Sequence, residues 1–172
     1  MKTRQRPQGA PEPQAPWNEI VPGLWMGGHY WVDASGEVRP AVVGREFDLV
    51  ISLFTRPGHG PAPNVEHMVA EIPDGPLTAG QLRTVQRLSR TAADAVRAGR
   101  VTLVRCHAGA NRSGLVIAQT LMEMGREAAA AIDVVRRRRA PWALGNRIFE
   151  EYLIAGLDVA CLLAGLDDPA DG

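Results

Sequence analysis

The segment from Val101 to Gly114 reads VTLVRCHAGANRSG and decides how the rest of the chain is interpreted. Val101 to Val104 is a short apolar run that predicts a buried strand, and the apolar residues after Gly114 recur at helical spacing. The loop between them therefore ends where a helix begins, and unpaired backbone N–H groups and the helix dipole favour an anion there. The segment predicts an anion-binding loop between a strand and a helix.

Three side chains of this loop have the chemistry of phosphate transfer. The thiolate of Cys106 is stabilised if it lies at a helix N-terminus. Arg112, six positions later, has a planar guanidinium suited to two oxygens of one tetrahedral anion, and the hydroxyl of Ser113 can reach back to the sulfur. The residues expected to bind the phosphate, mostly through backbone N–H groups, are His107, Ala108, Gly109, Ala110, Asn111 and Arg112.

Two other loop motifs do not fit. Gly109 and Gly114 have the spacing of a nucleotide-binding P-loop, but Leu115 and Val116 stand where that motif needs Lys and Ser or Thr. Asn111, two positions before Ser113, replaces the glycine of a nucleophile elbow, so Ser113 is not expected to be the nucleophile.

Cys-x5-Arg-Ser between a strand and a helix resembles the protein tyrosine phosphatase superfamily, and its surroundings look like the dual-specificity branch. The resemblance covers roughly Ile20 to Leu153. Pro22 to Gly27 is similar to the opening strand of that branch, and Asp74, 32 residues before Cys106, matches its general acid in a mobile loop. Its closing segment is echoed more weakly by Ala140-Pro141, Asn146, Phe149 and Tyr152.

The resemblance implies a phosphomonoester hydrolase that acts on phosphotyrosine, and on phosphoserine or phosphothreonine, in proteins. Cys106 would form a phosphocysteine, Arg112 would hold the phosphate oxygens, Asp74 would protonate the leaving group, and Ser113 would assist the departing thiolate. No metal and no organic cofactor is expected. The partner is a phosphorylated protein or a small phosphomonoester. The alternative role for Asp74 is structural: it would only stabilise a turn, since Pro-Asp-Gly is a preferred turn sequence.

Arg105 departs from the family pattern, in which a His directly precedes the nucleophile, helps hold the loop and tunes the sulfur. This departure keeps a second function open, a phosphate-binding module with weak or no turnover. A third, a sulfurtransferase or arsenate reductase, also uses a loop cysteine. Reductases need a resolving thiol, however, and Cys161 is expected to be a core residue of a distal helix.

The composition bounds the remaining classes. A chain of 172 residues suits one domain, and its 19 basic and 19 acidic residues cancel, so neither a nucleic-acid nor a membrane partner is expected. Two cysteines without metal spacing indicate a reducing compartment, and we expect a cytoplasmic monomer. The expected organisation is a flexible tail at 1–16, a phosphatase-like catalytic domain at 17–164 and an acidic flexible end at 165–172.

Strands early and helices late predict a single α/β domain in which helices flank a central mixed sheet. We expect His29, His59 and His67 at turns and on the surface. Of Arg136 to Arg139, most are expected in solvent, with one near the phosphate pocket. Strands are expected at 20–28, 47–53, 65–72 and 101–104, and helices after Thr78 as far as Gly99, from Leu115 to Gly125, from Glu127 to Arg139 and from Asn146 to Leu163.

Overall fold

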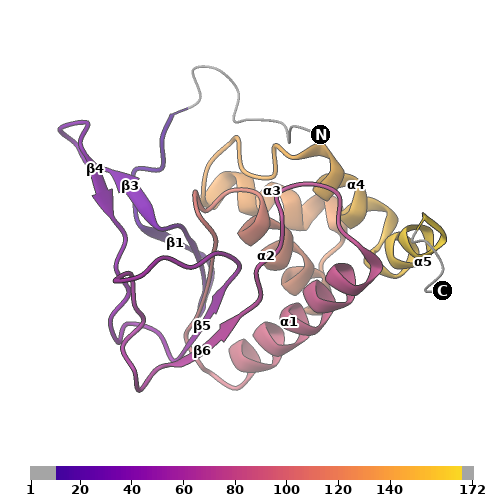
Figure 1. Cartoon of the computed structure of the whole chain (residues 1–172), viewed down its shortest axis with the longest axis horizontal. Coiled ribbons are helices and arrows are strands. Elements are labelled where there is room, and N and C mark those ends of the chain that lie inside the picture. Colours follow the sequence, from indigo (N-terminus) through magenta and orange to yellow (C-terminus); the bar gives the residue numbers. More distant parts are fainter. Residues whose placement is uncertain (1–10, 168–172) are drawn as a thin grey trace.

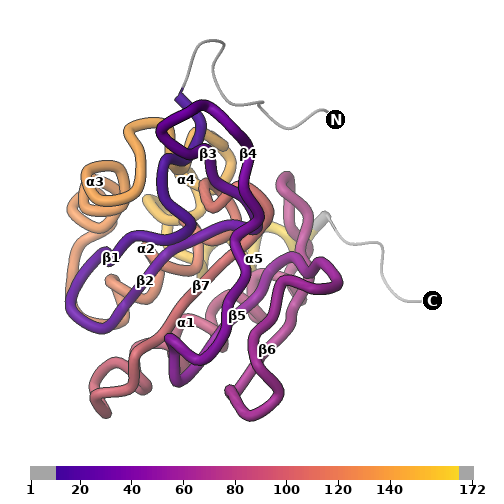
Figure 2. Tube along the Cα trace, turned by 90° about the vertical axis from the view of Figure 1, so that its left-hand side faces the viewer, coloured from indigo at the N-terminus to yellow at the C-terminus, as the bar shows by residue number. Residues whose placement is uncertain are grey.

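A five-stranded mixed sheet forms the centre of the protein in a computed structural model that describes residues 11–167 (Figure 1). The strand order is β1-β2-β7-β5-β6; only β1 and β2 are antiparallel, and a separate two-stranded sheet joins β3 to β4 (Figure 2). The strands are β1 Trp17–Val21, β2 Leu24–Gly27, β3 Tyr30–Val32, β4 Val38–Pro40, β5 Leu49–Ser52, β6 Glu66–Val69 and β7 Thr102–Arg105.

The helices gather on one side of this sheet (Figure 1). The alternation of side chains along the strands divides the core accordingly: Ile51 and Val104 pack toward the helices, whereas Val50 and Leu103 belong to a smaller cluster around Phe47. The expected α/β fold with a central mixed sheet is confirmed. The helices are α1 Ala79–Arg97, α2 Arg112–Glu123, α3 Ala128–Arg138, α4 Arg147–Ala155 and α5 Leu157–Asp167.

The central position of β7 places the phosphate-binding loop at the edge where parallel strands end. Gly27 of β2 and Ser52 of β5 both pair with Arg105, the last residue of β7. Residues that follow these three strands therefore meet at one edge of the sheet. Cys106 is the first residue beyond β7, and α2 begins at Arg112.

Three local predictions need correction. The strand expected at 20–28 is a hairpin, in which β1 and β2 are joined through Gly23 at φ 84°. The helix expected from Asn146 to Leu163 is divided into α4 and α5 at Gly156, whose φ of 94° is incompatible with a helix. The hairpin of β3 and β4 was not predicted, because its strands are short. The N-cap at Thr78 is confirmed, and Gln81 completes a capping box.

Part of the segment expected to be a flexible tail lies against the domain. The carbonyl oxygens of Pro13 and Pro16 accept hydrogen bonds from the N–H groups of Val32 (2.7 Å) and Gly28 (3.2 Å). At the other end, α5 extends to Asp167. The remainder of both expected ends, 1–10 and 168–172, lies outside the described residues.

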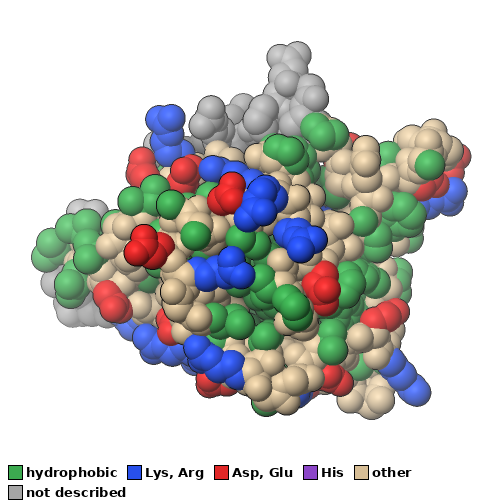
Figure 3. Space-filling view, turned by 180° about the vertical axis from the view of Figure 1, so that it is seen from behind, with side chains coloured by type: hydrophobic (Ala, Val, Ile, Leu, Met, Phe, Trp, Pro, Cys, Tyr) green, Lys and Arg blue, Asp and Glu red, His purple; other side chains and the backbone are tan. Residues whose placement is uncertain are grey.

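Basic and acidic side chains are interspersed on the rear of the molecule (Figure 3). Within residues 11–167, no helix is long and apolar enough to cross a membrane. The same part of the chain contains no group of three or more His, Cys, Asp or Glu side chains that could hold a metal ion.

Candidate active site

The loop from Cys106 to Asn111 turns tightly around the cysteine side chain. Cys106 is 2% exposed, and its Sγ lies 3.3 Å from Oγ of the buried Ser113. Gly109 has φ 70°, and a Cβ there would lie 2.6 Å from the backbone of Gly27. Glycine is needed here both for this conformation and for the close approach to β2.

The carbonyl groups on the outer side of the loop are all held by donors from other parts of the chain. The ring Nδ1 of His29 lies 2.8 Å from O of Cys106, and its backbone N–H donates to O of His107, also at 2.8 Å. Arg139 donates to O of Gly109 at 3.0 Å and, through a longer contact of 3.4 Å, to O of Ala108. The N–H of Leu144 donates to the carbonyl oxygen of Ala110 at 3.3 Å. The N–H of Leu115 donates to the carbonyl oxygen of Asn111 at 2.9 Å.

This arrangement leaves the N–H groups on the inner side of the loop. In a trans peptide the N–H points opposite to the C=O of the same plane, so fixing the carbonyls from 106 to 111 also fixes the N–H groups from 107 to 112. Among residues 11–167, no hydrogen-bond acceptor is found for these N–H groups. Buried N–H groups are almost always paired, so this set is suited to a bound anion.

Arg112 lies at the mouth of the loop. Its Nη1 is 3.5 Å from O of Ile72, and its guanidinium carbon is 5.6 Å from the ring centre of Phe54. No carboxylate in the described part of the chain forms an ion pair with it. Its five N–H donors can therefore meet an anion at the loop without first breaking a salt bridge.

The structure brings Asp74 to the loop, where the sequence predicted a general acid. Its two carboxylate oxygens accept hydrogen bonds from the side-chain amides of Asn146 (2.8 Å) and Asn111 (3.1 Å). The backbone N–H of Asn146 in turn donates to Oδ1 of Asn111 at 3.1 Å. The two asparagines tie the loop of Asp74 to the phosphate-binding loop and to the start of α4.

Arg105 points away from the loop toward the segment between β5 and β6. Its side chain is 1% exposed and donates to Oγ of Ser52 (2.9 Å) and to the carbonyl oxygens of His59 (2.9 Å) and Gly60 (2.6 Å). Burial lowers its pKa to about 10, so the guanidinium remains charged at neutral pH. Arg105 therefore holds the segment between β5 and β6 in place through hydrogen bonds and does not contact the sulfur of Cys106.

The histidines correct part of the sequence analysis, which predicted His29, His59 and His67 at turns and on the surface. His59 does close a turn, through its N–H to O of Arg56, but none of the three is fully exposed. His29 is 0% exposed, and burial lowers its pKa to about 4. His59 and His67 are half-buried, and Nε2 of His67 lies 2.7 Å from Oγ of Ser52. The position of His29 beside the loop follows from the strand order of the sheet. His29 comes after β2 at the same edge where Cys106 comes after β7.

Aromatic side chains form part of the rim. The ring of His107 lies between those of Tyr30 and Phe54, with centres 5.3 and 5.0 Å apart. Burial lowers the pKa of His107, and the nearby charges of Arg112 and Arg56 lower it further. The ring is therefore neutral at pH 7 and gives this side of the opening an aromatic surface.

Arg139 was only partly foreseen. The sequence predicted that one of Arg136 to Arg139 would lie near the phosphate pocket, and Arg139 is that residue. Besides the loop carbonyls, it donates to O of Ala15 (2.9 Å) and Oδ1 of Asn18 (2.8 Å), and burial lowers its pKa to about 10. It holds the outer side of the loop and does not point into the pocket.

Comparison with known proteins identifies the fold. Neither a family model nor a curated protein matches the sequence, whereas 114 chains of solved structures match the fold. Human DUSP28 is 25% identical with a TM-score of 0.64, covering 86% of this chain and 99% of its own. A mouse putative dual specificity phosphatase complexed with zinc tungstate is 24% identical with a TM-score of 0.59, covering 92% of this chain and 95% of its own.

A third similar structure is the human tyrosine phosphatase-like serine/threonine/tyrosine-interacting protein. It is 17% identical with a TM-score of 0.59, and the match covers 85% of this chain and 97% of that one. The likeness confirms the resemblance to the dual-specificity branch of the protein tyrosine phosphatase superfamily at the level of the fold.

Proposed function

We propose that the protein is a cysteine-dependent protein phosphatase that hydrolyses phosphotyrosine, with phosphoserine and phosphothreonine as further substrates. The observation that carries this proposal is the set of inward N–H groups from His107 to Arg112, which surround Cys106 and have no acceptor among the described residues. Such a set, next to a guanidinium that forms no ion pair among residues 11–167, matches the equatorial oxygens of a phosphoryl group. The similar mouse protein is complexed with zinc tungstate, and tungstate is a tetrahedral oxyanion like phosphate.

In the first step, the Cys106 thiolate attacks phosphorus in line and the bond from phosphorus to the ester oxygen breaks. The loop N–H groups and Arg112 hold the three remaining oxygens, and Asp74 gives its proton to the leaving oxygen. The products of this step are the free alcohol or phenol and a phosphocysteine.

In the second step, water attacks the phosphocysteine. Asp74, now a carboxylate, takes a proton from the water as the phosphorus–sulfur bond breaks and inorganic phosphate forms. The departing thiolate can accept a hydrogen bond from the hydroxyl of Ser113, whose oxygen lies 3.3 Å from the sulfur. Buried Ser113 therefore assists without forming a covalent bond.

The aromatic rim supports phosphotyrosine as the main substrate. Tyr30, Phe54 and His107 lie on one side of the loop, where a phenyl ring attached to the bound phosphate can pack against them. A serine or threonine phosphate lacks the ring and gains nothing from this contact.

A second candidate function is a phosphate-binding module without turnover. It is favoured by Arg105, which stands where the family has a His that helps hold the loop. The two functions share the anion site and differ only in whether the sulfur reacts. The third reading, a reductase with Cys161 as resolving thiol, gains no support, because the hydrogen-bonding contacts of that thiol are with Ala79 and Gln86 on α1.

Hydrolysis of a small aryl phosphate tests the proposal. The parent protein and the Cys161→Ser control should both turn over p-nitrophenyl phosphate, whereas Cys106→Ser should be inactive and still bind vanadate. A parent protein that binds vanadate without turnover would identify the binding module. Full activity of Cys106→Ser would reject the mechanism. Phosphotyrosine and phosphoserine peptides of identical sequence then measure the preference, with the tyrosine peptide expected to be the faster.

A further inference from the structure

We propose that His29 is a positioning residue for Cys106, acting through the carbonyl group of the nucleophile. The inference rests on the proposed function, since it assumes that the Cys106 sulfur reacts. Its basis is the 2.8 Å contact between Nδ1 of His29 and O of Cys106, between residues 77 positions apart in the sequence. A carbonyl oxygen can only accept, so Nδ1 carries the hydrogen.

The surroundings of His29 fix the ring in this orientation. It is 0% exposed and packs edge-on against Phe54 with ring centres 5.1 Å apart. Its backbone N–H donates to O of His107, so the backbone of His29 is also tied to the loop. Directly before it, a Cβ on Gly28 would lie 2.8 Å from O of His107, so a larger residue there would push β2 and the loop apart.

Burial is the main cause that lowers the pKa of His29 to about 4. The nearby Arg105, His59 and His107 lower the pKa further, and the hydrogen bond to O of Cys106 acts in the opposite direction. The ring is therefore neutral at the pH where a phosphatase works, and it acts as a fixed hydrogen-bond donor.

The hydrogen bond reaches the sulfur through one peptide group. The carbonyl of Cys106 and the N–H of His107 belong to the same peptide plane and point in opposite directions. A donor on the carbonyl polarises this plane and strengthens its N–H as a donor toward the inner side of the loop. It also prevents the plane from turning its carbonyl toward the sulfur.

His29 supplies a hydrogen bond to the carbonyl group of Cys106 that Arg105, the residue before the nucleophile, does not supply. Arg105 directs its side chain to Ser52, His59 and Gly60, so it cannot hold the loop carbonyl. The parallel pairing of Gly27 with Arg105 brings the residues that follow β2 alongside those that follow β7. An imidazole therefore reaches the nucleophile's carbonyl from the adjacent strand.

Two amide variants test the proposal in a Cys161→Ser background, where Cys106 is the only thiol. In His29→Asn, the side-chain nitrogen occupies nearly the place of Nδ1, so the variant should stay within about three-fold of the parent. In His29→Gln, the amide is displaced by one methylene and the carbonyl loses its donor. This variant should react about ten-fold more slowly.

Two measurements are made on each variant. The first is the rate of Cys106 alkylation by iodoacetamide from pH 5 to pH 9, for which His29→Gln should need a higher pH to reach half its maximum. The second is the kinetics with p-nitrophenyl phosphate, for which kcat should fall and KM should change little. Alkylation requires no phosphoryl transfer, so it tests the role of His29 even if the protein proves to be a binding module.

The outcomes separate positioning from a merely structural role. Slower alkylation at low pH in His29→Gln, with recovery in His29→Asn, supports the proposal. Equal alkylation profiles for the parent and His29→Gln would overturn it, even if the melting temperature of the variant falls. Equal losses in the Asn and Gln variants would also overturn it, because the position of the donor would then be irrelevant.

Discussion

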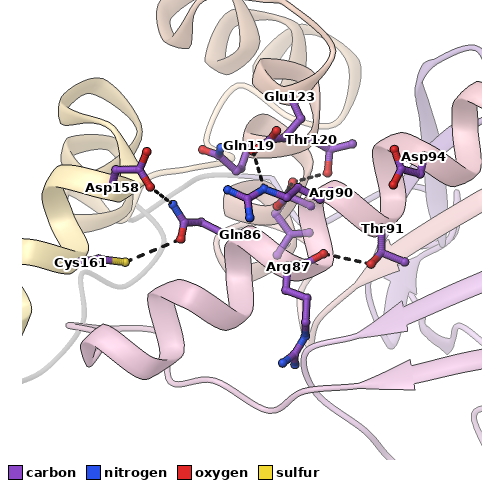
Figure 4. A network of polar contacts seen from close by, with 12 residues as sticks. Gln86, Arg87, Arg90, Thr91, Asp94, Gln119, Thr120, Glu123, Asp158 and Cys161 are labelled. Carbon is purple, nitrogen blue, oxygen red and sulfur yellow. Dashed lines mark hydrogen bonds and ion pairs between the residues drawn. The ribbon is translucent and has the colours of Figure 1, made fainter.

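The two cysteines of the chain lie in opposite backbone environments. Cys106 is surrounded by N–H groups that have no acceptor among the described residues, whereas Cys161 lies 3.9 Å from O of Ala79 and 3.9 Å from Oε1 of Gln86. Figure 4 shows the Cys161 thiol beside Gln86, whose amide donates to Asp158 at 2.7 Å; these three residues form the network around Cys161. Burial raises the pKa of Cys161.

The difference shows that the exposure of a thiol does not decide its chemistry. Cys161 is the more accessible of the two, yet oxygen atoms face it and disfavour a thiolate. Cys106 is 2% exposed, and the donors around it favour an anion. Each of the following predictions therefore pairs a change at the loop with the same type of change elsewhere.

The largest effect is expected at Arg112. Arg112→Lys keeps the charge and loses the planar fork, so kcat/KM for an aryl phosphate should fall by about 10³-fold. Arg90→Lys is the matched control, at an exposed arginine of α1 that lies 3.8 Å from Glu123 and away from the loop. Near-native kcat/KM in Arg112→Lys would show that no bidentate contact is made.

The next effect is expected at Asp74. Asp74→Asn removes the proton donor and should lower kcat by about 10² for a phosphotyrosine peptide, whose leaving group needs protonation. The loss should be much smaller for an activated aryl ester. Asp158→Asn repeats the substitution in the network around Cys161 and should leave both rates unchanged. Equal losses for the two leaving groups would place the general acid elsewhere, with Glu71 as the next candidate. Glu66 is not one, because it begins β6 at the opposite edge of the sheet and pairs with Arg100.

A smaller effect is expected at the outer side of the loop. Arg139→Lys cannot hold Gly109, Ala15 and Asn18 together, and kcat should fall by about ten-fold through loss of loop order. Arg137→Lys, in the exposed pair with Asp133 at 2.7 Å, should change kcat little. Equal kinetics for the two variants would contradict the role assigned to Arg139.

The inner and outer sides of the phosphate-binding loop also differ in how far the sequence could predict them. The inner side of the loop was predictable, because Cys106, Arg112 and Ser113 lie within one strand-loop-helix segment and their chemistry depends on spacing. The outer side is held by His29 and Arg139, which are 77 and 33 positions from Cys106. Neither has a local motif, and their positions follow only from strand order and from the packing of α3.

The sheet and most helices were predictable for a similar reason. The buried strands β5 and β7 contain short apolar stretches with β-branched residues, and α1 has both a cap and helical periodicity. The break at Gly156 was missed because the apolar pattern continues through it. The hairpin of β3 and β4 was missed because strands of three residues leave almost no pattern.

The last prediction concerns the free energy of unfolding and its dependence on pH. The pKa of His29 is about 4 in the folded protein and 6.5 in an unfolded chain, so between these values the unfolded chain binds the extra proton. Stability is therefore fully present above pH 6.5 and falls as the pH is lowered toward 4, by up to about 3 kcal/mol for this one group. Burial also lowers the pKa values of His67 and His107, which act in the same direction.

Urea unfolding from pH 4.5 to pH 7.5 measures this slope. His29→Asn removes the titrating ring and keeps a donor near Cys106, so its free energy of unfolding should fall less steeply with acid than that of the parent. His67→Asn is the matched control and should leave most of the slope, because His29 is the more deeply buried of the two rings. If His29→Asn and the parent have the same slope, the ring of His29 is not held neutral by the fold. The imidazole at the carbonyl of Cys106 would then become protonated already below about pH 6.5, and in that range the contrast with Cys161 would depend on its charge as well as on backbone donors.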